Sequence, residues 1–322
     1  MTSQHVTVAV VGSGYMGGGI AQVLALSGAT VRIADVSEEI ARKNYGRLLD
    51  EAREFVADGL FPQDAVERLE ANLSPAASIE EAVAEADFIE EAVPEKLEIK
   101  HETLRRISAA ARLDAIIGSN TSTILIASLA EAVERPERFL GVHFSNPAPF
   151  IPGVELIPHP GTDESLIPFV ERLVAATGKE SARVKDATGF VLNRLQYALF
   201  HEASQIVEEG IATPEDIDTI VRTTFGFRLP VFGPFAIADM AGLDVYSFCY
   251  ASLQTRWPER FATPESLKEL VEAGKFGTKS GEGYLDVPAE RIPELVAYRN
   301  RAYVAMKKLM DELGPAPIHT DN

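Results

Sequence analysis

The sequence predicts an α/β domain with a doubly wound parallel sheet, followed by an all-α C-terminal domain. In the first half, short and nearly continuous apolar runs alternate with helical patterns, which is typical of a parallel sheet covered on both faces. After Asp186 the strand signals stop and only helical patterns follow. The length of 322 residues exceeds what one hydrophobic core usually supports, so two domains are expected.

The first domain is predicted over residues 1–186. Its strand candidates are residues 6–11, 30–35, 87–93, 115–119 and 139–144, with a further short apolar run at 154–157. The helical patterns between them are residues 16–27, 38–58, 63–71, 79–85 and 97–111. Repeated strand–helix units of this kind predict the doubly wound arrangement.

The second domain is predicted to be entirely helical over residues 187–313. Its helical patterns are residues 189–209, 214–225, 233–241, 244–254, 264–273 and 288–313. The pattern at 214–225 begins with Pro214 directly after Thr213, a favourable helix cap. Residues 314–322 contain two prolines and little apolar content, so we expect a frayed tail.

Composition excludes several classes of partner. Lys and Arg number 30 and Asp and Glu 48, which gives a formal net charge of −18 and a pI near 4.8. An acidic protein is poorly suited to nucleic acid or anionic lipid, because both require a surplus of basic residues. No apolar run approaches the length of a membrane span, and residues 1–9 lack the features of a signal peptide. Cys249 is the only cysteine, so we expect a cytoplasmic protein without a disulfide.

A dinucleotide site is predicted at the end of the first strand. The strand candidate leads directly into Gly12-Ser13-Gly14-Tyr15-Met16-Gly17, and a helical pattern begins at once. This is the G-x-G-x-x-G fingerprint of a Rossmann-type domain in its required context. Gly12 permits the tight turn, Gly14 the approach of the pyrophosphate, and Gly17 close packing of helix on strand. Asp35 ends the second strand, where a carboxylate binds the ribose 2′-hydroxyl and repels a 2′-phosphate, so NAD is favoured over NADP.

His143 is the strongest candidate for a catalytic base. Oxidation of an alcohol by NAD requires a base for the hydroxyl proton while the hydride leaves from carbon. Of the six histidines, His143 ends a strand candidate, where ligand sites of open α/β sheets lie. Glu155 follows twelve residues later on the next apolar run, and a carboxylate there could orient the imidazole. Considered alone, a histidine at a strand end is more often structural, so the residues themselves leave both interpretations open.

Six ordered blocks extend this interpretation over nearly the whole chain. They are residues 12–20 with Asp35, 91–95, 119–122, 143–147 with Glu155, 186–194 and 277–284. In order and spacing these blocks resemble the L-3-hydroxyacyl-CoA dehydrogenase family, which includes relatives of the λ-crystallin/L-gulonate and carnitine dehydrogenase type. The resemblance implies an NAD-binding domain with a helical arm at about residues 38–71. It also implies that the helical domain binds a small-molecule substrate and forms a homodimer.

The resemblance also implies roles for single residues. His143 matches the general base and Glu155 its orienting carboxylate, while Ser122 and Asn193 match residues that contact the substrate. The implied cofactor-binding residues are Gly12, Gly14, Tyr15, Met16, Gly17 and Asp35, with Glu95, Lys100, Asn120 and Asn146 near the nicotinamide and its ribose. Structural alternatives remain: Ser122 suits a helix cap, Asn193 suits an ordinary first helical turn, and Glu95 and Lys100 suit exposed helix charges. No metal ligand is predicted.

The substrate is expected to be an L-3-hydroxyacyl-CoA or a closely related 3-hydroxy acid, oxidised to the 3-keto compound. Two departures favour a small non-CoA hydroxy acid or alcohol of the L-gulonate, carnitine or pyridine-carboxylate type. Residues 144–152 lack the second aromatic and the Pro-Val-Pro run typical of acyl-CoA members. The arm region 37–70 has nine acidic and five basic residues, which suits the phosphates of CoA poorly. A remote alternative is a non-catalytic NAD-binding structural or redox-sensing protein.

Overall fold

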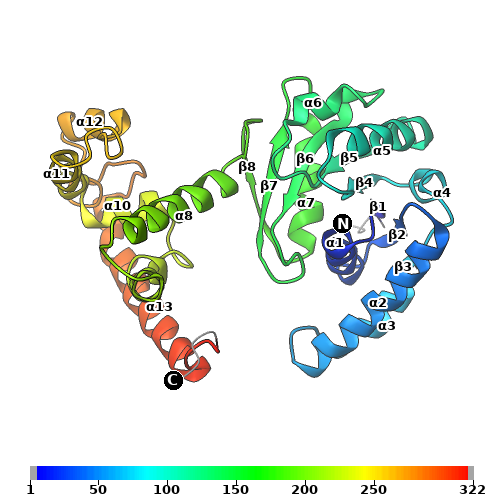
Figure 1. Ribbon diagram of the computed structural model, residues 1–322, viewed down its shortest axis with the longest axis horizontal. Coiled ribbons are helices and arrows are strands. Elements are labelled where there is room, and N and C mark those ends of the chain that lie inside the picture. Colours follow the sequence, from blue (N-terminus) through cyan, green and yellow to red (C-terminus); the bar gives the residue numbers. More distant parts are fainter. Residues whose placement is uncertain (1–5, 318–322) are drawn as a thin grey trace. The chain divides into compact units, whose positions relative to one another are not determined.

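The computed structural model describes residues 6–317, and the chain folds into two compact units. Unit 1 is Met1–Phe200 and unit 2 is His201–Asn322 (Figure 1). The division falls within one long helix, α8 (Leu192–Glu208). The predicted boundary between residues 186 and 187 stays a prediction. The ends of the chain, including residues 318–322 of the expected frayed tail, lie outside the described residues.

Unit 1 is built on an eight-stranded sheet within residues 6–317, in the order β3-β2-β1-β4-β5-β6-β7-β8. The strands are β1 (Thr7–Val11), β2 (Thr30–Ala34), β3 (Leu73–Pro75), β4 (Phe88–Glu91), β5 (Ile116–Ser119), β6 (Phe139–Phe144), β7 (Gly153–Pro158) and β8 (Glu180–Arg183). The strand order reverses between β1 and β4, which is the switch point of a doubly wound sheet. The predicted fold is thereby confirmed, with one exception to the parallel pairing: β7 runs antiparallel to β6, and β8 is parallel to β7.

Helices cover both faces of this sheet (Figure 1). They are α1 (Tyr15–Leu26), α2 (Glu38–Ala57), α3 (Ala65–Asn72), α4 (Ile79–Val83), α5 (Leu97–Ala110), α6 (Ile126–Ala130) and α7 (Ile167–Ala176). One apolar core lies under α1, α2, α3 and α7, and includes Ile20, Leu48 and Val170. The other lies under α4, α5 and α6. Because both faces are buried, the central strands read as continuous apolar runs.

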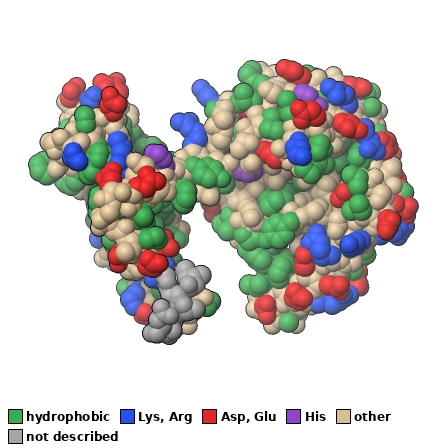
Figure 2. All heavy atoms as spheres, viewed as in Figure 1, with side chains coloured by type: hydrophobic (Ala, Val, Ile, Leu, Met, Phe, Trp, Pro, Cys, Tyr) green, Lys and Arg blue, Asp and Glu red, His purple; other side chains and the backbone are tan. Residues whose placement is uncertain are grey.

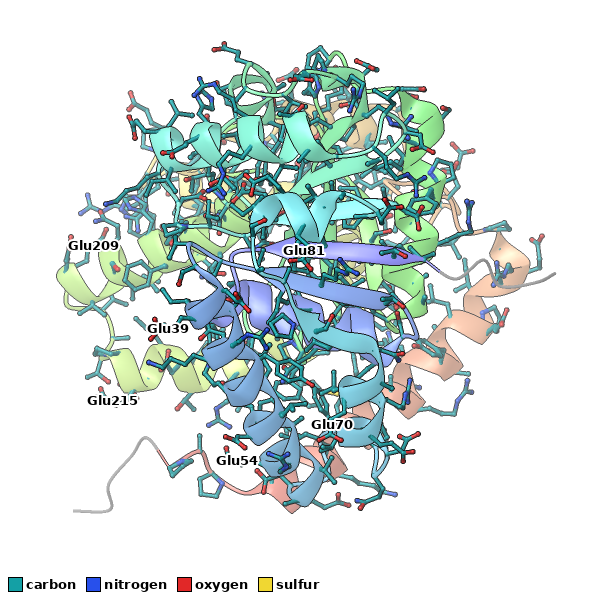
Figure 3. The ribbon with its side chains drawn as sticks, turned by 90° about the vertical axis from the view of Figure 1, so that its right-hand side faces the viewer. Glu39, Glu54, Glu70, Glu81, Glu209 and Glu215 are labelled. Atoms are coloured by element: carbon teal, nitrogen blue, oxygen red, sulfur yellow. The ribbon has the colours of Figure 1, made fainter. Side chains whose placement is uncertain are left out.

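The helical arm consists of α2 and α3, which pack on α1 through Leu48 and Leu69. The hydroxyl of Ser37 caps α2 by accepting a hydrogen bond from Ile40 N. Carboxylates line the surface of the arm: Figure 3 labels Glu39 and Glu54 on α2 and Glu70 on α3. The excess of acidic over basic residues in segment 37–70 is therefore spread along the exposed side of both helices.

Unit 2 contains the remaining helices. They are α9 (Pro214–Thr223), α10 (Pro234–Ala241), α11 (Leu243–Gln254), α12 (Glu265–Glu272) and α13 (Ile292–Leu313). The buried carboxylate of Asp239 accepts hydrogen bonds from the N–H groups of Tyr284 and Leu285, and so fastens the 277–285 loop to α10. Gly277 is required there, because its φ is +74° and a Cβ would lie 2.3 Å from the carbonyl oxygen of Asp239.

The predicted helices of both halves are present, but several short elements were not predicted. They are β3, β8, α6, α7 and the 3-10 turns Pro136–Arg138, Glu164–Leu166, Gly226–Arg228 and Ala289–Arg291. Strands of three or four residues present too few positions for a periodic pattern. Among residues 6–317, no helix has both the length and the apolar composition needed to cross a membrane.

Candidate active site

The glycine-rich turn after β1 has the geometry that a dinucleotide requires. Gly12 has a φ of +98°, and a Cβ there would lie 2.6 Å from the carbonyl oxygen of Ala92. A Cβ on Gly17 would lie 1.8 Å from the carbonyl oxygen of Gly12, so only glycine allows α1 to pack this closely. A Cβ on Gly14, in contrast, would meet no neighbouring segment within 4 Å among residues 6–317. The turn is therefore open at Gly14 and at the N-terminus of α1, where phosphate groups bind.

Asp35 is held against this turn by Ser13. The backbone N–H and the hydroxyl of Ser13 both donate to Asp35 Oδ2, at 2.8 and 2.6 Å, and Val36 N donates to Oδ1 at 2.8 Å. The arm completes the network, because Asn44 Nδ2 donates to the Ser13 hydroxyl at 2.8 Å. Arg47 donates to the carbonyl oxygens of Ser13 and Gly14. The sequence does not predict this role for Ser13, which occupies an unconstrained position of the glycine-rich motif.

A cavity of about 1260 Å³ runs from the glycine-rich turn to His143, and all of its lining residues belong to unit 1. The predicted residues that line it are Gly12, Gly14, Met16, Asp35, Glu95, Asn120, Ser122, His143, Asn146 and Asn193. Gly17 and Lys100 are buried behind this lining, and Tyr15 is exposed at the start of α1. The cavity thus brings the predicted nucleotide and substrate residues together.

Ser122 is positioned by Glu95. Glu95 Oε1 accepts hydrogen bonds from the N–H groups of Ser122 and Thr123, at 2.8 and 2.9 Å, and from the hydroxyl of Thr121 at 2.7 Å. The hydroxyl of Ser122 itself lies 3.2 Å from the same oxygen. Burial alone would raise the pKa of Glu95, but these donors and the Lys100 ammonium lower it to about 2. Glu95 therefore remains charged and orders the turn that carries Ser122.

Lys100 is completely buried, which rules out the alternative of an exposed helix charge. Its ammonium group lies 2.9 Å from Glu91 Oε1 and 3.4 Å from Glu95 Oε2, and Ser119 Oγ donates to Glu91 Oε2 at 2.6 Å. Removing one partner of a buried ion pair leaves an uncompensated charge, so this group stabilises the cavity wall only as a unit. Glu91 lies within the sequence block 91–95, but its role as the ion-pair partner of Lys100 becomes visible only in the structure.

Glu90 and its neighbour Glu91 point to opposite faces of β4, because successive side chains of a strand alternate. Its side chain is fully buried, and neither carboxylate oxygen has a hydrogen-bond partner among the described residues. Oε2 packs against Gly118, where a Cβ would lie 2.4 Å away. Burial, with the neighbouring charge of Glu91, raises the pKa of Glu90 well above its usual range. The neutral form of Glu90 is therefore favoured relative to that of an ordinary glutamate.

His143 and Glu155 meet across the antiparallel pair β6–β7. The two residues are register partners, and His143 Nδ1 lies 2.9 Å from Glu155 Oε2. Both side chains are buried, and the other oxygen of Glu155 accepts hydrogen bonds from Val191 N and Leu192 N at 2.9 Å each. Burial would raise the pKa of Glu155, but the bonds from His143 and from these two N–H groups hold it below its usual range. An ionised carboxylate can only accept, so Nδ1 of His143 carries the proton and Nε2 is free to accept one.

Two of the three predicted asparagines, Asn193 and Asn120, connect the segments around His143. Asn193 Nδ2 donates to the carbonyl oxygen of Ser122 at 2.9 Å, which links the start of α8 to the Ser122 turn. Asn120 Oδ1 accepts from Phe144 N at 2.8 Å and so joins the ends of β5 and β6. Asn146 precedes a cis proline, Pro147, in the loop that leads from β6 to β7. The predicted residues thus lie around one end of the cavity.

Comparison with known proteins accounts for most of the chain. The family model of the 3-hydroxyacyl-CoA dehydrogenase NAD binding domain matches residues 7–187, and that of the 3-hydroxyacyl-CoA dehydrogenase C-terminal domain matches residues 189–287.

Two curated relatives illustrate the range of substrates. The chain is 35% identical over 308 residues to a 5-formyl-3-hydroxy-2-methylpyridine 4-carboxylate 5-dehydrogenase of Mesorhizobium japonicum. The matched region covers 94% of this chain and 98% of the relative. The chain is also 35% identical over 290 residues to a hydroxyacyl-coenzyme A dehydrogenase of Homo sapiens, covering 87% and 90%. Among solved structures, a 3-hydroxyacyl-CoA dehydrogenase from Archaeoglobus fulgidus superposes with a TM-score of 0.75 at 33% identity, covering 96% of this chain and 99% of that one.

Proposed function

The chain belongs to the 3-hydroxyacyl-CoA dehydrogenase family, and from this premise we propose that it oxidises an L-3-hydroxyacyl-CoA, or a closely related 3-hydroxy acid, to the 3-keto compound. It is an NAD-dependent oxidoreductase, since residues 7–187 form the NAD-binding domain of the family. The observation that supports the proposed reaction best is the buried His143–Glu155 pair at the end of the cavity that begins at the glycine-rich turn.

In this proposal His143 is the general base. Its Nε2 takes the proton of the substrate hydroxyl, and the ionised Glu155 stabilises the imidazolium that results. NAD, when bound, supplies the acceptor for the hydride that leaves the substrate carbon. The glycine-rich turn would hold its pyrophosphate, and Asp35 a ribose hydroxyl. Ser122 and Asn193 are neutral donors that could polarise the carbonyl oxygen in the reverse direction.

A substrate panel tests this proposal. Purified protein is incubated with NAD and 3-hydroxybutyryl-CoA, longer 3-hydroxyacyl-CoA thioesters or free 3-hydroxy acids, and NADH formation is followed by absorbance. We expect turnover that falls by at least about 10²-fold in His143→Ala, the usual minimum contribution of a general base. Unchanged turnover in this variant would refute the mechanism. Absence of turnover with every compound would favour the non-catalytic alternative.

A second candidate is the dehydrogenation of a small free hydroxy acid or alcohol. The arm has nine acidic and five basic residues over 37–70, an unfavourable surface for the phosphates of CoA. The pyridine-carboxylate dehydrogenase of M. japonicum is as similar to this chain as the human acyl-CoA enzyme is. A kcat/KM at least tenfold higher for 3-hydroxybutyryl-CoA than for free 3-hydroxybutyrate, L-gulonate and carnitine would support the thioester. The reverse order would support the small acid.

We propose a homodimer formed through the helical half. In the described part of unit 2, residues 201–317, only five apolar residues are buried, namely Phe232, Ile237, Ala238, Leu243 and Leu267, while Phe248 is 75% exposed. Further large apolar side chains, among the green ones in Figure 2, are exposed on α9, α10 and α13. Exposed apolar surface on this scale suits a permanent interface. Light scattering at micromolar concentration tests the proposal, and the mass of a monomer would contradict it.

We also propose a cytoplasmic location, because a reducing compartment suits the exposed thiol of Cys249.

A further inference from the structure

Phe190 has an unusual backbone conformation. Among residues 6–317 it is the only non-glycine residue with a positive φ, at +47°. It follows Gly189, whose φ is +76°, so two consecutive residues adopt the left-handed conformation. For a bulky side chain this conformation is sterically costly, and it persists where surrounding contacts enforce it.

The left-handed pair directs the start of α8 toward Glu155. Immediately after the pair, Val191 N and Leu192 N both donate to Glu155 Oε1 at 2.9 Å. Successive N–H groups that converge on one oxygen form an anion-binding concavity, and the positive end of the helix dipole adds to it. The backbone of Phe190 thus determines where two of the donors that lower the pKa of Glu155 are placed.

The ring of Phe190 supports the other member of the pair. The side chain is 1% exposed, and its ring centroid lies 5.9 Å from that of the His143 imidazole, at an interplanar angle of 55°. Aromatic pairs at this separation and tilt attract one another beyond their buried area. The His143 imidazole therefore has Glu155 on one side and the Phe190 ring on another. The backbone of Phe190 in turn places the N–H groups that hold Glu155.

Phe139 shows what a purely structural phenylalanine looks like in the same unit. It is also fully buried, and its ring lies 6.2 Å from the imidazole of His159 at 46°. Its backbone, however, is ordinary β-strand, and His159 Nε2 is bonded to the carbonyl oxygen of Pro136 rather than to a carboxylate. Both phenylalanines belong to the same apolar core. They differ in that only Phe190 is linked to both partners of the His143–Glu155 pair.

We infer that Phe190 is a positioning residue that holds His143 and Glu155 in their reactive alignment, its backbone acting on Glu155 and its ring on His143. The inference rests on the proposed function only for its kinetic consequence. The alignment itself is a property of the free protein.

The kinetic test compares Phe190→Leu and Phe190→Met with Phe139→Leu. We expect kcat to fall by roughly tenfold or more in both Phe190 variants, because small misplacements of reacting groups cost up to about 10²-fold. The KM for NAD should stay within about twofold, since Phe190 is not among the residues that line the cavity. Phe139→Leu should keep kcat within about threefold.

Equal losses in the Phe190 and Phe139 variants, or no loss in either, would overturn the inference. NAD binding by fluorescence titration identifies a variant that has lost its fold, in which case Phe190→Met decides.

A second readout is independent of substrate. In the free protein, the low-field resonance of the His143 Nδ1 proton is assigned by its disappearance in His143→Asn. We expect it to broaden or shift upfield in Phe190→Leu and to be unchanged in Phe139→Leu. An unchanged resonance in Phe190→Leu would overturn the inference even if the wild-type protein is active. If the wild-type protein has no activity but the resonance responds as expected, the proposed function fails and the positioning role stands.

Discussion

Glu155 faces His143 directly across the antiparallel pairing of β6 and β7, and the two side chains meet at 2.9 Å on one face of the sheet. Replacing Glu155 by Gln tests this relationship. The amide can still accept from Val191 N and Leu192 N, but it no longer offers His143 a negative charge. We expect kcat to fall by about 10²-fold or more in steady-state assays, because the imidazolium loses its counter-charge and the tautomer is no longer fixed.

The matched control is Glu171→Gln, which removes an exposed partner of Arg183 in the same unit. Its kcat should remain within about twofold of the wild-type value. A similar loss in both variants would mean that Glu155 contributes only to folding.

Ser13→Ala tests whether the arm contributes to cofactor selection. The variant removes the hydroxyl that connects Asn44 to Asp35 and leaves the carboxylate with fewer fixed donors. We expect the KM for NAD to rise by roughly three- to tenfold, which corresponds to the net contribution of about one ordinary hydrogen bond, while kcat is unchanged. The preference for NAD over NADP should fall in the same assays. Ser27→Ala, at the far end of α1, removes a hydroxyl that bonds the Leu24 carbonyl, and it should leave both constants unchanged.

Glu95→Gln tests the carboxylate that orders the Ser122 turn. The folded-state pKa of Glu95 is lowered to about 2, so its stabilising contribution is present above the unfolded value near 4.5 and is lost as pH falls toward 2. The difference in unfolding midpoint between wild type and Glu95→Gln should therefore be largest above about pH 5 and shrink in acid. The variant should also lower kcat, because Ser122 is less ordered.

Asp163→Asn is the control for Glu95, since Asp163 also caps a turn and its pKa is also lowered, by the hydroxyl and N–H of Ser165. It should reproduce part of the acid-dependent loss of stability without a change in kcat. If Glu95→Gln keeps full activity, the link between Glu95 and Ser122 is structural only.

Glu90→Gln tests the buried, unpartnered carboxyl of β4. Its folded-state pKa is raised by burial and by Glu91, so the native protein binds a proton that the unfolded chain releases above about pH 4.5. Stability contributed by this group is therefore lost as pH rises. In thermal unfolding between pH 5 and pH 9, the advantage of Glu90→Gln over wild type should grow with pH. Glu54→Gln, an exposed carboxylate on the arm, should show no such trend, and parallel curves for Glu90→Gln and wild type would contradict the assignment.

The parts of the site that depend on local sequence were predictable. Gly12, Gly14 and Gly17 follow a strand and precede a helix, and Asp35 ends the next strand, so spacing alone indicates their common location. The proximity of Glu155 to His143 was also accessible, because adjacent apolar runs with a short connection commonly pair.

Contacts between distant segments were not predictable in the same way. The Glu95 carboxylate bonds a turn 26 to 28 residues away, and Lys100 is buried although its segment reads as an amphipathic helix. Phe190 lies in the sequence block 186–194, but its backbone conformation was not predictable, since propensity argues against a left-handed phenylalanine and only tertiary contacts impose one. The short strands β3 and β8 lack any pattern because pairing at the sheet edges, rather than composition, defines them.

The reversal of β7 relative to β6 has an evolutionary consequence. It places His143 and Glu155 on neighbouring strands joined by a single loop, and that loop supplies Ser145, Asn146 and Ile151 to the cavity wall. The His143–Glu155 pair is fixed by strand register, whereas the loop between its two members is anchored separately, through the bond from Lys179 Nζ to the Ile151 carbonyl oxygen. One short stretch of gene therefore encodes both members of the pair at its two ends and part of the cavity wall in its middle. Exchange of the middle alone would change this part of the cavity wall while the His143–Glu155 pair is inherited intact.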